Sequence, residues 1–382
     1  MAAIEFWIPK GAILFTEGGI SYEFREHLGE AHHGLSLLLA RQRTAEGKPQ
    51  GKVLLKAVGR PSLREGDRVA KARAKLEEQV RLATYLQHPG IVRVHGLHKA
   101  EGAWYVITDH PSGHSLNEVL GLAMECERWF SPLFTLYVGA QVAGALHHAH
   151  TAQDAAGRPL GIVHRAMDLE HIFVDWAGQV QVSDFGMAFS TLPGRVASTV
   201  HRPQGDTYFS SPELLLTGRV DARSDLFALG LVMLELAAGK NLLYTGKGVP
   251  EEAVAALSPK KRAGAVRAIR RARLAGCDDA LEEIIWRAAT YTPQDVEEVT
   301  AGLPQALRVP LCKLLQPSPA DRYQSAGELE AHLRGWLGGT FGAQEAGAEL
   351  KAVADEARER MADMELPASL VRRRSQGAIT MH

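Results

Sequence analysis

A stretch at residues 161–186 concentrates side chains that could carry out chemistry. Asp168 and Asp184 supply carboxylates, which hold hard cations such as Mg²⁺, and His171 supplies an imidazole, which suits Zn, Cu or Ni better. Two short apolar runs between these polar positions predict a pair of strands flanked by two loops. We therefore expect the polar side chains on loops that a small strand pair positions.

The order of the motifs in this stretch follows a known pattern. The dipeptide His-Arg stands at 164–165 and the tripeptide Asp-Phe-Gly at 184–186. The stretch resembles the catalytic core of a protein kinase, in which His-Arg-Asp is followed by a Lys two positions after the Asp and an Asn five positions after it. This chain has Ala166 in place of that Asp, Asp168 in place of the Lys and His171 in place of the Asn.

The resemblance implies that these substitutions fall on the transfer step. Ala166 cannot accept a proton, so a general-base contribution of about 10² to 10⁴ in rate is absent unless another group supplies it. Asp168 is the nearby candidate substitute, but its carboxylate would repel the phosphoryl group that the family's lysine attracts. Asp206 stands where a threonine usually joins the same cluster. If Asp168 and Asp206 approach each other, the pair would bind a cation or share a proton.

The resemblance also implies a nucleotide-binding site. A turn between Gly29 and Gly34 corresponds to the family's glycine-rich turn over the phosphates, with Ala31 in place of its middle glycine. In isolation the same residues fit a plain hairpin turn equally well. Lys56, on a predicted strand, corresponds to the lysine that pairs with the α- and β-phosphates.

The family holds this lysine with a glutamate on the following helix. Counting nine residues back from His88 places Gln79 at that position, and a slip of one residue would place Glu78 there. A neutral amide contributes a hydrogen bond but no charge. With Gln79 at this position, we therefore expect nucleotide binding through Lys56 to be weaker by roughly 1 to 2 kcal/mol.

The linker between the expected lobes and the metal positions also depart from the family pattern. Asp109 is a candidate nucleotide contact in this linker, and Thr108 falls at the position that guards the back of the pocket. Pro111 falls where a backbone N–H would donate to adenine, and proline has no N–H. Asp184 corresponds to the aspartate that holds the phosphate-bridging metal, whereas His171 replaces an oxygen ligand of the second metal. We therefore expect ATP with Mg²⁺ or Mn²⁺ to bind weakly if it binds.

Other matches to the family are structural. Glu213 and Arg322 correspond to a buried ion pair, Asp225 to an aspartate that holds the catalytic-loop backbone, and Gly230 to a close packing point. Arg165 corresponds to the arginine that docks a phosphorylated activation segment.

The pattern of the whole chain predicts an α+β, bilobal, protein-kinase-like fold. Strand-like runs around one helical stretch predict a small antiparallel-sheet N-lobe, and longer periodic runs predict a mainly helical C-lobe. The expected divisions are an N-terminal extension with a strand or hairpin at 1–20, a kinase-like domain at 21–337 with lobes at 21–110 and 111–337, a long insert at about 240–302, and a tail with a short amphipathic helix at 338–382.

Composition excludes some classes of function. Lys and Arg number 43 against 44 Asp and Glu, so no global field draws the chain to nucleic acid or to an anionic membrane. Three cysteines far apart in sequence indicate neither a disulfide framework nor a zinc site. Without a leader pattern or an apolar run of about 18 residues, we expect a soluble cytoplasmic protein.

Two segments outside the catalytic pattern are candidates for contact with a protein partner. Residues 260–273 carry seven basic and no acidic residues, which fits a solvated helix face or a surface for an acidic partner. Nucleic acid is disfavoured because no aromatic residues are interleaved. Residues 343–366 of the tail carry apolar positions at three- and four-residue spacing.

Together these features favour a kinase-fold regulatory or scaffolding protein. It resembles bacterial eukaryote-like Ser/Thr protein kinases and is interpreted as a pseudokinase with weak or no ATP-dependent phosphotransfer. The alternative is a divergent, active ATP-dependent Ser/Thr kinase that uses Lys56 and Asp184. Phosphotransfer to a small molecule is disfavoured by the kinase-like Ser-Pro-Glu segment at 211–213.

Overall fold

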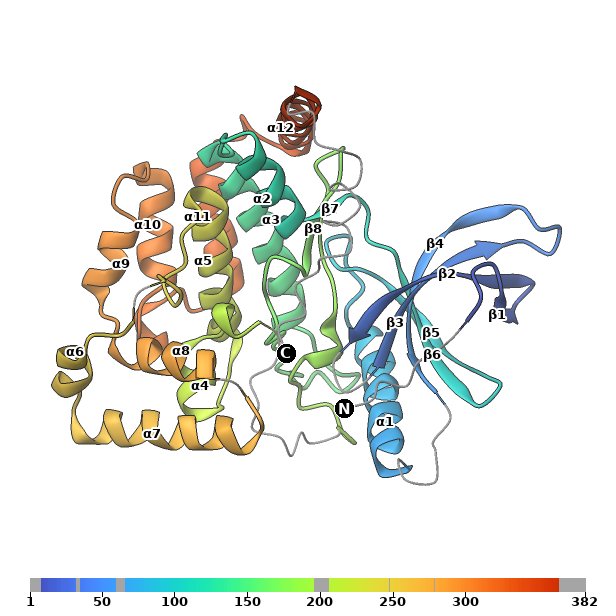
Figure 1. The fold of residues 1–382 in the computed structure, drawn as a ribbon, viewed down its shortest axis with the longest axis horizontal. Coiled ribbons are helices and arrows are strands. Elements are labelled where there is room, and N and C mark those ends of the chain that lie inside the picture. Colours follow the sequence, from blue (N-terminus) through green and yellow to red (C-terminus); the bar gives the residue numbers. More distant parts are fainter. Residues whose placement is uncertain are drawn as a thin grey trace.

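The computed structural model describes residues 8–31, 35–59, 66–195, 206–246, 248–277 and 279–363. These residues form two lobes, a sheet lobe and a helical lobe, that meet at the linker leading out of β6 (Figure 1). The expected bilobal α+β fold is confirmed.

The N-lobe is a curled antiparallel sheet with strand order β1-β2-β3-β4-β6-β5. Its apolar core includes Leu38, Leu55 and Ile107, which lie on neighbouring strands. The strand expected before residue 20 forms a hairpin with β2. The strands are β1 (Ile13–Glu17), β2 (Ile20–Ala31), β3 (Leu35–Arg43), β4 (Pro49–Val58), β5 (Val94–Ala100) and β6 (Ala103–Asp109).

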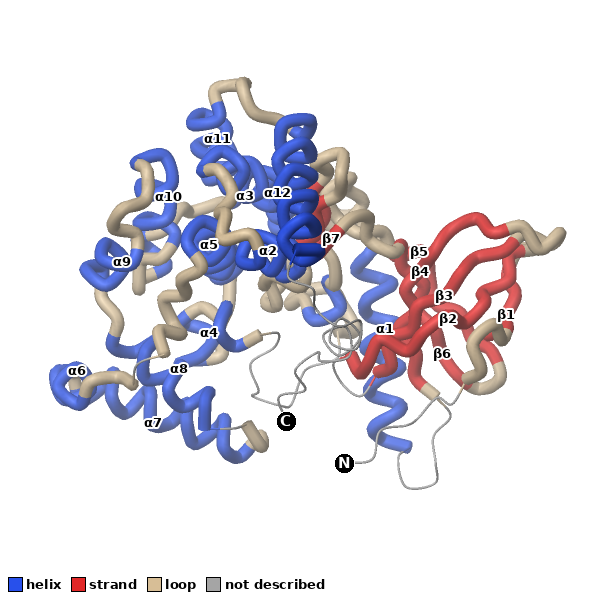
Figure 2. Tube along the Cα trace, turned by 45° about the horizontal axis from the view of Figure 1, so that its top comes forward, coloured by secondary structure: helices blue, strands red, loops and turns tan. Residues whose placement is uncertain are grey.

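A single described helix, α1 (Gly66–Ala83), belongs to this lobe and packs beside the sheet (Figure 2). Its buried residues Val69, Ala72 and Leu76 contact Val58 and Val106 of the sheet. The helix therefore lies at the back of the cleft between the lobes, with its C-terminal half directed toward the loop that carries Asp-Phe-Gly.

A second, small sheet lies where the lobes meet. It has the order β7 (His114–Ser115), β8 (Ile172–Val174) and β9 (Val180–Val182), and it confirms the expected strand pair. Val182 also hydrogen-bonds with the N-lobe backbone at Gly90 and Val92, at 2.8 and 2.9 Å. The two loops that flank this sheet are therefore fixed against both lobes.

The C-lobe is built around α5 (Ala222–Ala238), which is buried along most of its length. Gly230 allows a close approach of α10, because a Cβ there would lie 2.9 Å from the Cβ of Leu314. The other helices of the lobe before the insert and after it are α2 (Leu116–Glu125), α3 (Pro132–His150), α4 (Pro212–Thr217), α10 (Gln305–Leu314) and α11 (Ala326–Leu337).

The region expected to be a long insert is helical in its described residues. It contains α6 (Glu251–Ala256), α7 (Pro259–Leu274), α8 (Asp279–Thr290) and α9 (Pro293–Val299). The basic run at 260–273 forms most of α7, and α7 packs against α4 and α8.

The tail helix, α12 (Ala343–Asp363), is longer than expected and does not stand apart from the domain. Its apolar residues Leu350, Val353 and Ala357 are fully buried and join the core of the C-lobe, where the helix packs against α2 and α3. The expected apolar stripe is therefore used within the chain, and the part of it beyond Asp363 lies outside the described residues.

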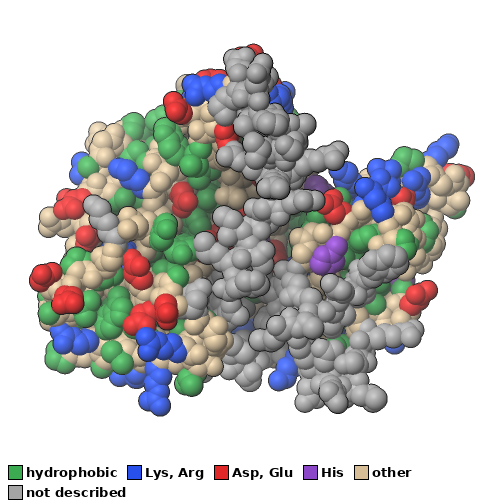
Figure 3. Space-filling view, viewed as in Figure 1, with side chains coloured by type: hydrophobic (Ala, Val, Ile, Leu, Met, Phe, Trp, Pro, Cys, Tyr) green, Lys and Arg blue, Asp and Glu red, His purple; other side chains and the backbone are tan. Residues whose placement is uncertain are grey.

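The surface shows no single dominant charge on the face drawn in Figure 3, where basic and acidic side chains are interspersed. No helix in the described ranges has the length and apolar character needed to cross a bilayer.

Candidate functional site

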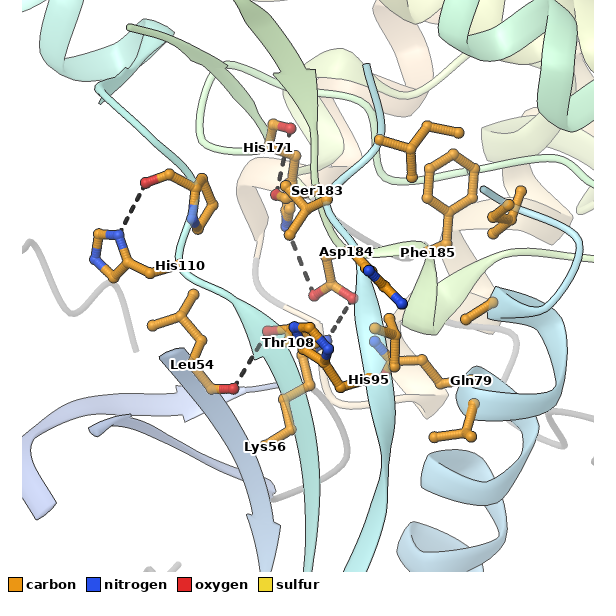
Figure 4. Close-up of a pocket in the computed structure, with 18 of the residues that line it drawn as sticks. Leu54, Lys56, Gln79, His95, Thr108, His110, His171, Ser183, Asp184 and Phe185 are labelled. Atoms are coloured by element: carbon orange, nitrogen blue, oxygen red, sulfur yellow. Dashed lines mark hydrogen bonds and ion pairs between the residues drawn. The ribbon is translucent and has the colours of Figure 1, made fainter. Parts of the chain in front are cut away.

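A cavity of about 720 Å³ opens between the lobes, within the usual range for small-molecule sites. Leu54 and Phe173 belong to its apolar lining. Lys56, His171 and Asp184 are among its charged and polar residues (Figure 4). The structure thus brings residues from the N-lobe sheet and from both flanking loops of the small sheet to one place.

Lys56 and Asp184 form an ion pair through Nζ and Oδ1, with side chains only 11% and 16% exposed. Asp184 has a left-handed backbone (φ +59°), a strained conformation for a residue other than glycine. Its carboxylate accepts a hydrogen bond from the Gly186 N–H at 2.9 Å. Burial opposes the charge, but Lys56 and His171 hold the pKa of Asp184 well below its usual range, so the carboxylate stays ionised.

Gln79, rather than Glu78, lies beside Lys56. A Cβ added at Gly186 would come within 2.9 Å of Gln79 Oε1 and 3.1 Å of Lys56 Nζ, so the two groups converge over this glycine. Glu78 instead pairs with Lys75 at 3.0 Å and with Arg195 at 3.4 Å. The structure thus places Gln79 where the count put it, and α1 brings an amide rather than a carboxylate to the lysine.

The loop that carries Ala166 keeps a well-defined backbone. Asp225 accepts hydrogen bonds from the backbone N–H groups of His164 and Arg165 at 2.8 and 2.9 Å, and from His150 Nε2 at 2.8 Å. This confirms the expected role of Asp225 and shows that His150 serves it. Ala166 itself is buried and offers only a methyl group.

Asp168 is engaged within its own loop. Its Oδ1 accepts hydrogen bonds from the N–H groups of Glu170 and His171 at 2.9 and 3.1 Å and from His171 Nδ1 at 2.7 Å. Asp168 therefore orients His171 and is buried, rather than extending into the cavity as a free proton acceptor. Their spacing of three residues is compatible with this pair but does not determine it in an irregular loop, and sequence reasoning missed it.

His171 directs its other ring nitrogen at Asp184, with Nε2 3.9 Å from Oδ2 (Figure 4). Burial disfavours the imidazolium, but the charges of Asp168 and Asp184 outweigh it and raise the pKa of His171. The two carboxylates thus favour a positive charge where the family resemblance implies an oxygen ligand for a second metal.

The donor set fits one divalent ion and not two. Asp184 offers a carboxylate oxygen, the donor that Mg²⁺ and Mn²⁺ accept, but an imidazolium at His171 repels a second ion. Among the residues that the structure describes, no group of three His, Cys, Asp or Glu side chains is arranged to hold a metal.

Asp206 caps a short 3-10 helix, η3 (Thr207–Phe209), by accepting from the Tyr208 N–H at 2.9 Å. Partial loss of hydration first, and then the negative charges of Asp168 and Glu170, raise the pKa of Asp206, although the residue keeps solvent-exposed surface. The carboxylates of Asp206 and Asp168 do not hydrogen-bond to each other, so the expected shared proton or cation between them stays a hypothesis.

The remaining predicted nucleotide contacts are spread around the cavity. Pro111 and Thr108 line it, and Thr108 donates its hydroxyl to the Leu54 carbonyl at 3.3 Å. Gly29 lies in β2 with φ +123°, whereas Gly34 is outside the described residues.

Asp109 behaves differently from its neighbours in the linker. Its Oδ1 pairs with His95 Nε2 at 2.6 Å, and its side chain is half exposed and is not among the residues that line the cavity. The structure therefore does not place this predicted contact residue in the site.

The Arg165 side chain contacts the backbone of the activation segment, the stretch at 187–210 that follows Asp-Phe-Gly. Its guanidinium donates to the Met187 carbonyl at 2.8 Å from Nε, and burial followed by the charge of Arg195 lowers the pKa of Arg165 to about 10. Arg81 of α1 donates to the carbonyls of Pro193 and Gly194 at 2.8 and 3.0 Å. Hydrogen bonds at Pro193 and Gly194 therefore hold this part of the activation segment against α1.

The expected ion pair between Glu213 and Arg322 is present and bidentate, at 2.9 and 3.0 Å. The Arg322 side chain is fully buried, which makes this pair a fixed link between α4 and the segment before α11.

Comparison with known proteins agrees with this geometry. The sequence model of the protein kinase domain matches residues 22–324. The tyrosine-protein kinase MasK of Myxococcus xanthus is 31% identical over 263 residues, which cover 68% of this chain and 38% of that protein. The serine/threonine-protein kinase PrkC of Bacillus subtilis is 24% identical over 260 residues, which cover 68% of this chain and 33% of that protein. The match therefore spans about a third of the length of these relatives.

Proposed function

Because the chain belongs to the protein kinase family, we propose that it acts as a pseudokinase: a regulatory or scaffolding protein with weak or no ATP-dependent phosphotransfer. The observation that carries this proposal is the pair of changes on one loop. Ala166 offers no proton acceptor, and Asp168, the nearest substitute, is hydrogen-bonded to His171. An acceptor hydroxyl would meet no positioned base.

The charge distribution supports the same proposal. Where the family places a lysine to attract the transferring phosphoryl group, this chain has the carboxylate of Asp168, and Asp206 adds a second carboxylate nearby. Transition-state charge is stabilised by positioned donors and cations, and carboxylates at these positions act in the opposite direction.

Weak nucleotide binding is compatible with the residues that remain. Lys56 and Asp184 keep the positions that hold phosphates and one divalent ion, and the cavity is large enough for a nucleotide. Gln79 and Pro111 each remove one favourable contact. We therefore propose that ATP binds weakly, with Mg²⁺ or Mn²⁺ at Asp184. We further propose that the protein acts in the cytoplasm, where ATP is present, and that ATP binding stabilises its fold.

The second candidate function is a divergent active Ser/Thr protein kinase. The ion pair between Lys56 and Asp184 and the backbone network around Asp225 favour it, because both support the geometry of an active site. Such an enzyme would need a proton acceptor that comes with the substrate or from a rearranged loop.

A thermal-shift titration with ATP tests the nucleotide grip. Binding at 100 times the dissociation constant adds about 2.7 kcal/mol to the stability of the folded chain. We expect a shift only at high ATP concentration, and its loss in Lys56→Met, with exposed Lys52→Met as the matched control. No shift in the wild type would contradict nucleotide binding and leave only the interaction role. Phosphate transfer that Asp184→Ala abolishes would contradict the pseudokinase proposal.

A further inference from the structure

Helix α7 presents a ridge to solvent that is both basic and apolar. Val266 and Leu274 are 52% and 81% exposed, and Arg267 and Arg270 lie between them on the same side of the helix. The opposite side, which includes Ile269, packs against the C-lobe. Neither Arg267 nor Arg270 forms an ion pair with another residue in the described ranges.

Only part of the basic charge of α7 is neutralised within the insert. Arg273 pairs with Glu282, while Arg262 and Arg271 donate to backbone carbonyls. The interpretation of the helix as a solvated face whose charges are paired nearby therefore applies to Arg273. It does not apply to the ridge formed by Val266, Arg267, Arg270 and Leu274.

A groove of complementary character lies on the same insert. It has a cavity volume of about 470 Å³ between α6 and α8, with Val249, Val254 and Trp286 as apolar lining. Glu251 and Asp279 also line it, are exposed and form no ion pair with another described residue. The groove is thus apolar and acidic, the counterpart of a ridge that is apolar and basic.

We propose that the ridge of α7 binds in the α6–α8 groove of a second copy of this chain. Helices α6, α7 and α8 lie together at one end of the C-lobe, where α7 runs along the edge of the lobe below α4 and α8, and acidic and basic side chains gather there (Figures 1 and 3). Two copies can therefore exchange ridge and groove reciprocally, which gives two identical contacts and a closed dimer. Leu274 supplies the apolar side chain that enters the groove, and Arg267 and Arg270 face its carboxylates.

Charge favours a second copy over the other occupants. An anionic membrane would meet Glu251 and Asp279 beside the ridge and be repelled by them. An acidic segment of another protein would contact the ridge but leave the groove unfilled. A partner that carries both a basic ridge and an acidic groove contacts both surfaces at once, and a second copy of this chain is such a partner. The dimer does not depend on whether the nucleotide site transfers phosphate.

Sedimentation velocity of the full chain over a range of concentrations tests the proposal. We expect a concentration-dependent dimer that weakens when salt shortens the Debye length from about 10 Å at 0.1 M to about 3 Å at 1 M. The double variants Arg267→Glu/Arg270→Glu and Glu251→Lys/Asp279→Lys should each raise the dimer dissociation constant on the order of a hundredfold, because like charges then face each other.

Dimerisation in an equimolar mixture of the two double variants is the test that decides. Each contact in the mixed dimer again joins opposite charges, so dimerisation should return to near the wild-type level. Lys48→Glu/Lys52→Glu, a charge reversal of the same size on the exposed edge of the N-lobe, should leave the dimer unchanged. Leu274→Ser, at an exposed position that the fold does not need, should weaken the dimer without loss of thermal stability.

Three results would overturn the proposal. The full chain could remain monomeric at low salt, the two charge variants could dimerise as well as the wild type, or the mixture could stay monomeric although both variants melt like the wild type.

Discussion

His171 stands between two carboxylates. Its Nδ1 hydrogen-bonds to Asp168 at 2.7 Å, and its Nε2 lies 3.9 Å from Asp184. With its pKa raised, the imidazolium supplies a fixed positive charge next to the residue that would hold a divalent ion. A metal ion at Asp184 therefore competes with His171, so Mg²⁺ should add less to ATP binding than it would with an oxygen ligand at position 171.

His171→Asn should make nucleotide binding depend on Mg²⁺. The variant replaces a competing cation with an oxygen donor, so we expect Mg²⁺ to tighten ATP binding on the order of tenfold in the variant and much less in the wild type. The measurement is the ATP-induced thermal shift in Mg²⁺ and in EDTA, with exposed His27→Asn as the matched control. Equal dependence on Mg²⁺ in all three proteins would contradict the competition.

Asp206→Asn should stabilise the protein at neutral pH. The pKa of Asp206 is raised in the folded state, so the folded chain holds this proton more tightly than the unfolded chain does. Wild-type stability from this group is thus present below the ordinary value of 3.8 and is lost as pH rises through the folded pKa. Asparagine keeps the cap on the Tyr208 N–H without the charge.

Urea unfolding of the wild type and Asp206→Asn at about pH 4 and at about pH 7 checks this sign. The variant should be more stable at the higher pH, and the difference should shrink at the lower pH. A variant that is less stable at neutral pH would show that Asp206 has a cationic partner in the folded state.

Motif spacing predicted some side chains of the site and could not predict others. The resemblance to the family's motifs gave Lys56 and Asp184, and a count of residues back from His88 gave Gln79. The structure brings Lys56 to Asp184 and Gln79 beside them. The pairing of Asp168 with His171 lies in an irregular loop, where spacing fixes no direction. Asp109 was placed in the site by its position in the linker, but its pair with His95 keeps it outside.

At the scale of elements, α12 extends the C-lobe beyond residue 324, where the region matched to the family ends. Gly347 of α12 lies against the turn between β8 and β9, where an added Cβ would come within 2.5 Å of the Trp176 carbonyl oxygen. Glu349 accepts a hydrogen bond at 2.7 Å from the hydroxyl of Ser131, the N-cap of α3. The helix thus supports the small sheet that positions the site.

Gly347→Ala should destabilise the chain by about 1 to 3 kcal/mol, because the contacted atoms are backbone and cannot move aside easily. Gly335→Ala on α11 is the control, since no atom lies within 4 Å of its added Cβ, and it should be neutral or stabilising by up to about 1 kcal/mol. The measurement is chemical denaturation. Equal stability of the two variants would mean that α12 is not held against the turn.

The link between α4 and the end of the C-lobe makes a second prediction at this scale. Arg322→Met leaves Glu213 largely buried without its bidentate partner, which should cost about 3 to 5 kcal/mol. Arg358→Met, which removes an exposed pair with Asp355, should cost less than about 1 kcal/mol. Urea midpoints compare the two. A small loss in Arg322→Met would show that water reaches the pair.

Elements were predicted better than their contacts. Periodicity predicted the N-lobe strands, α1, α3 and α5 because each has a long pattern that tertiary contacts reinforce. The apolar stripe of the tail predicted a helix but not its docking on α2 and α3, because periodicity identifies an apolar face and not what covers it. For the same reason the basic run at 260–273 indicated α7 but not the groove beside it.

On the scale of the whole molecule, the two lobes and their connections are those of the family, while Ala166 stands at the position of the family's catalytic base. Asp225, Glu213 and Arg322 keep the loop and the C-lobe in place. These structural networks do not depend on phosphate transfer, so the fold can persist as a binding scaffold. We infer that stability and recognition, rather than turnover, are the properties that this chain retains.

Transfer of labelled phosphate from ATP is the measurement that tests this claim most directly. The wild type, Asp184→Ala and Ala166→Asp are incubated with ATP and Mg²⁺ or Mn²⁺ and a generic protein substrate. We expect the wild type to transfer no more labelled phosphate than the Asp184→Ala background. Transfer by the wild type near the family's range of about 1 to 100 per second, lost in Asp184→Ala, would contradict this expectation.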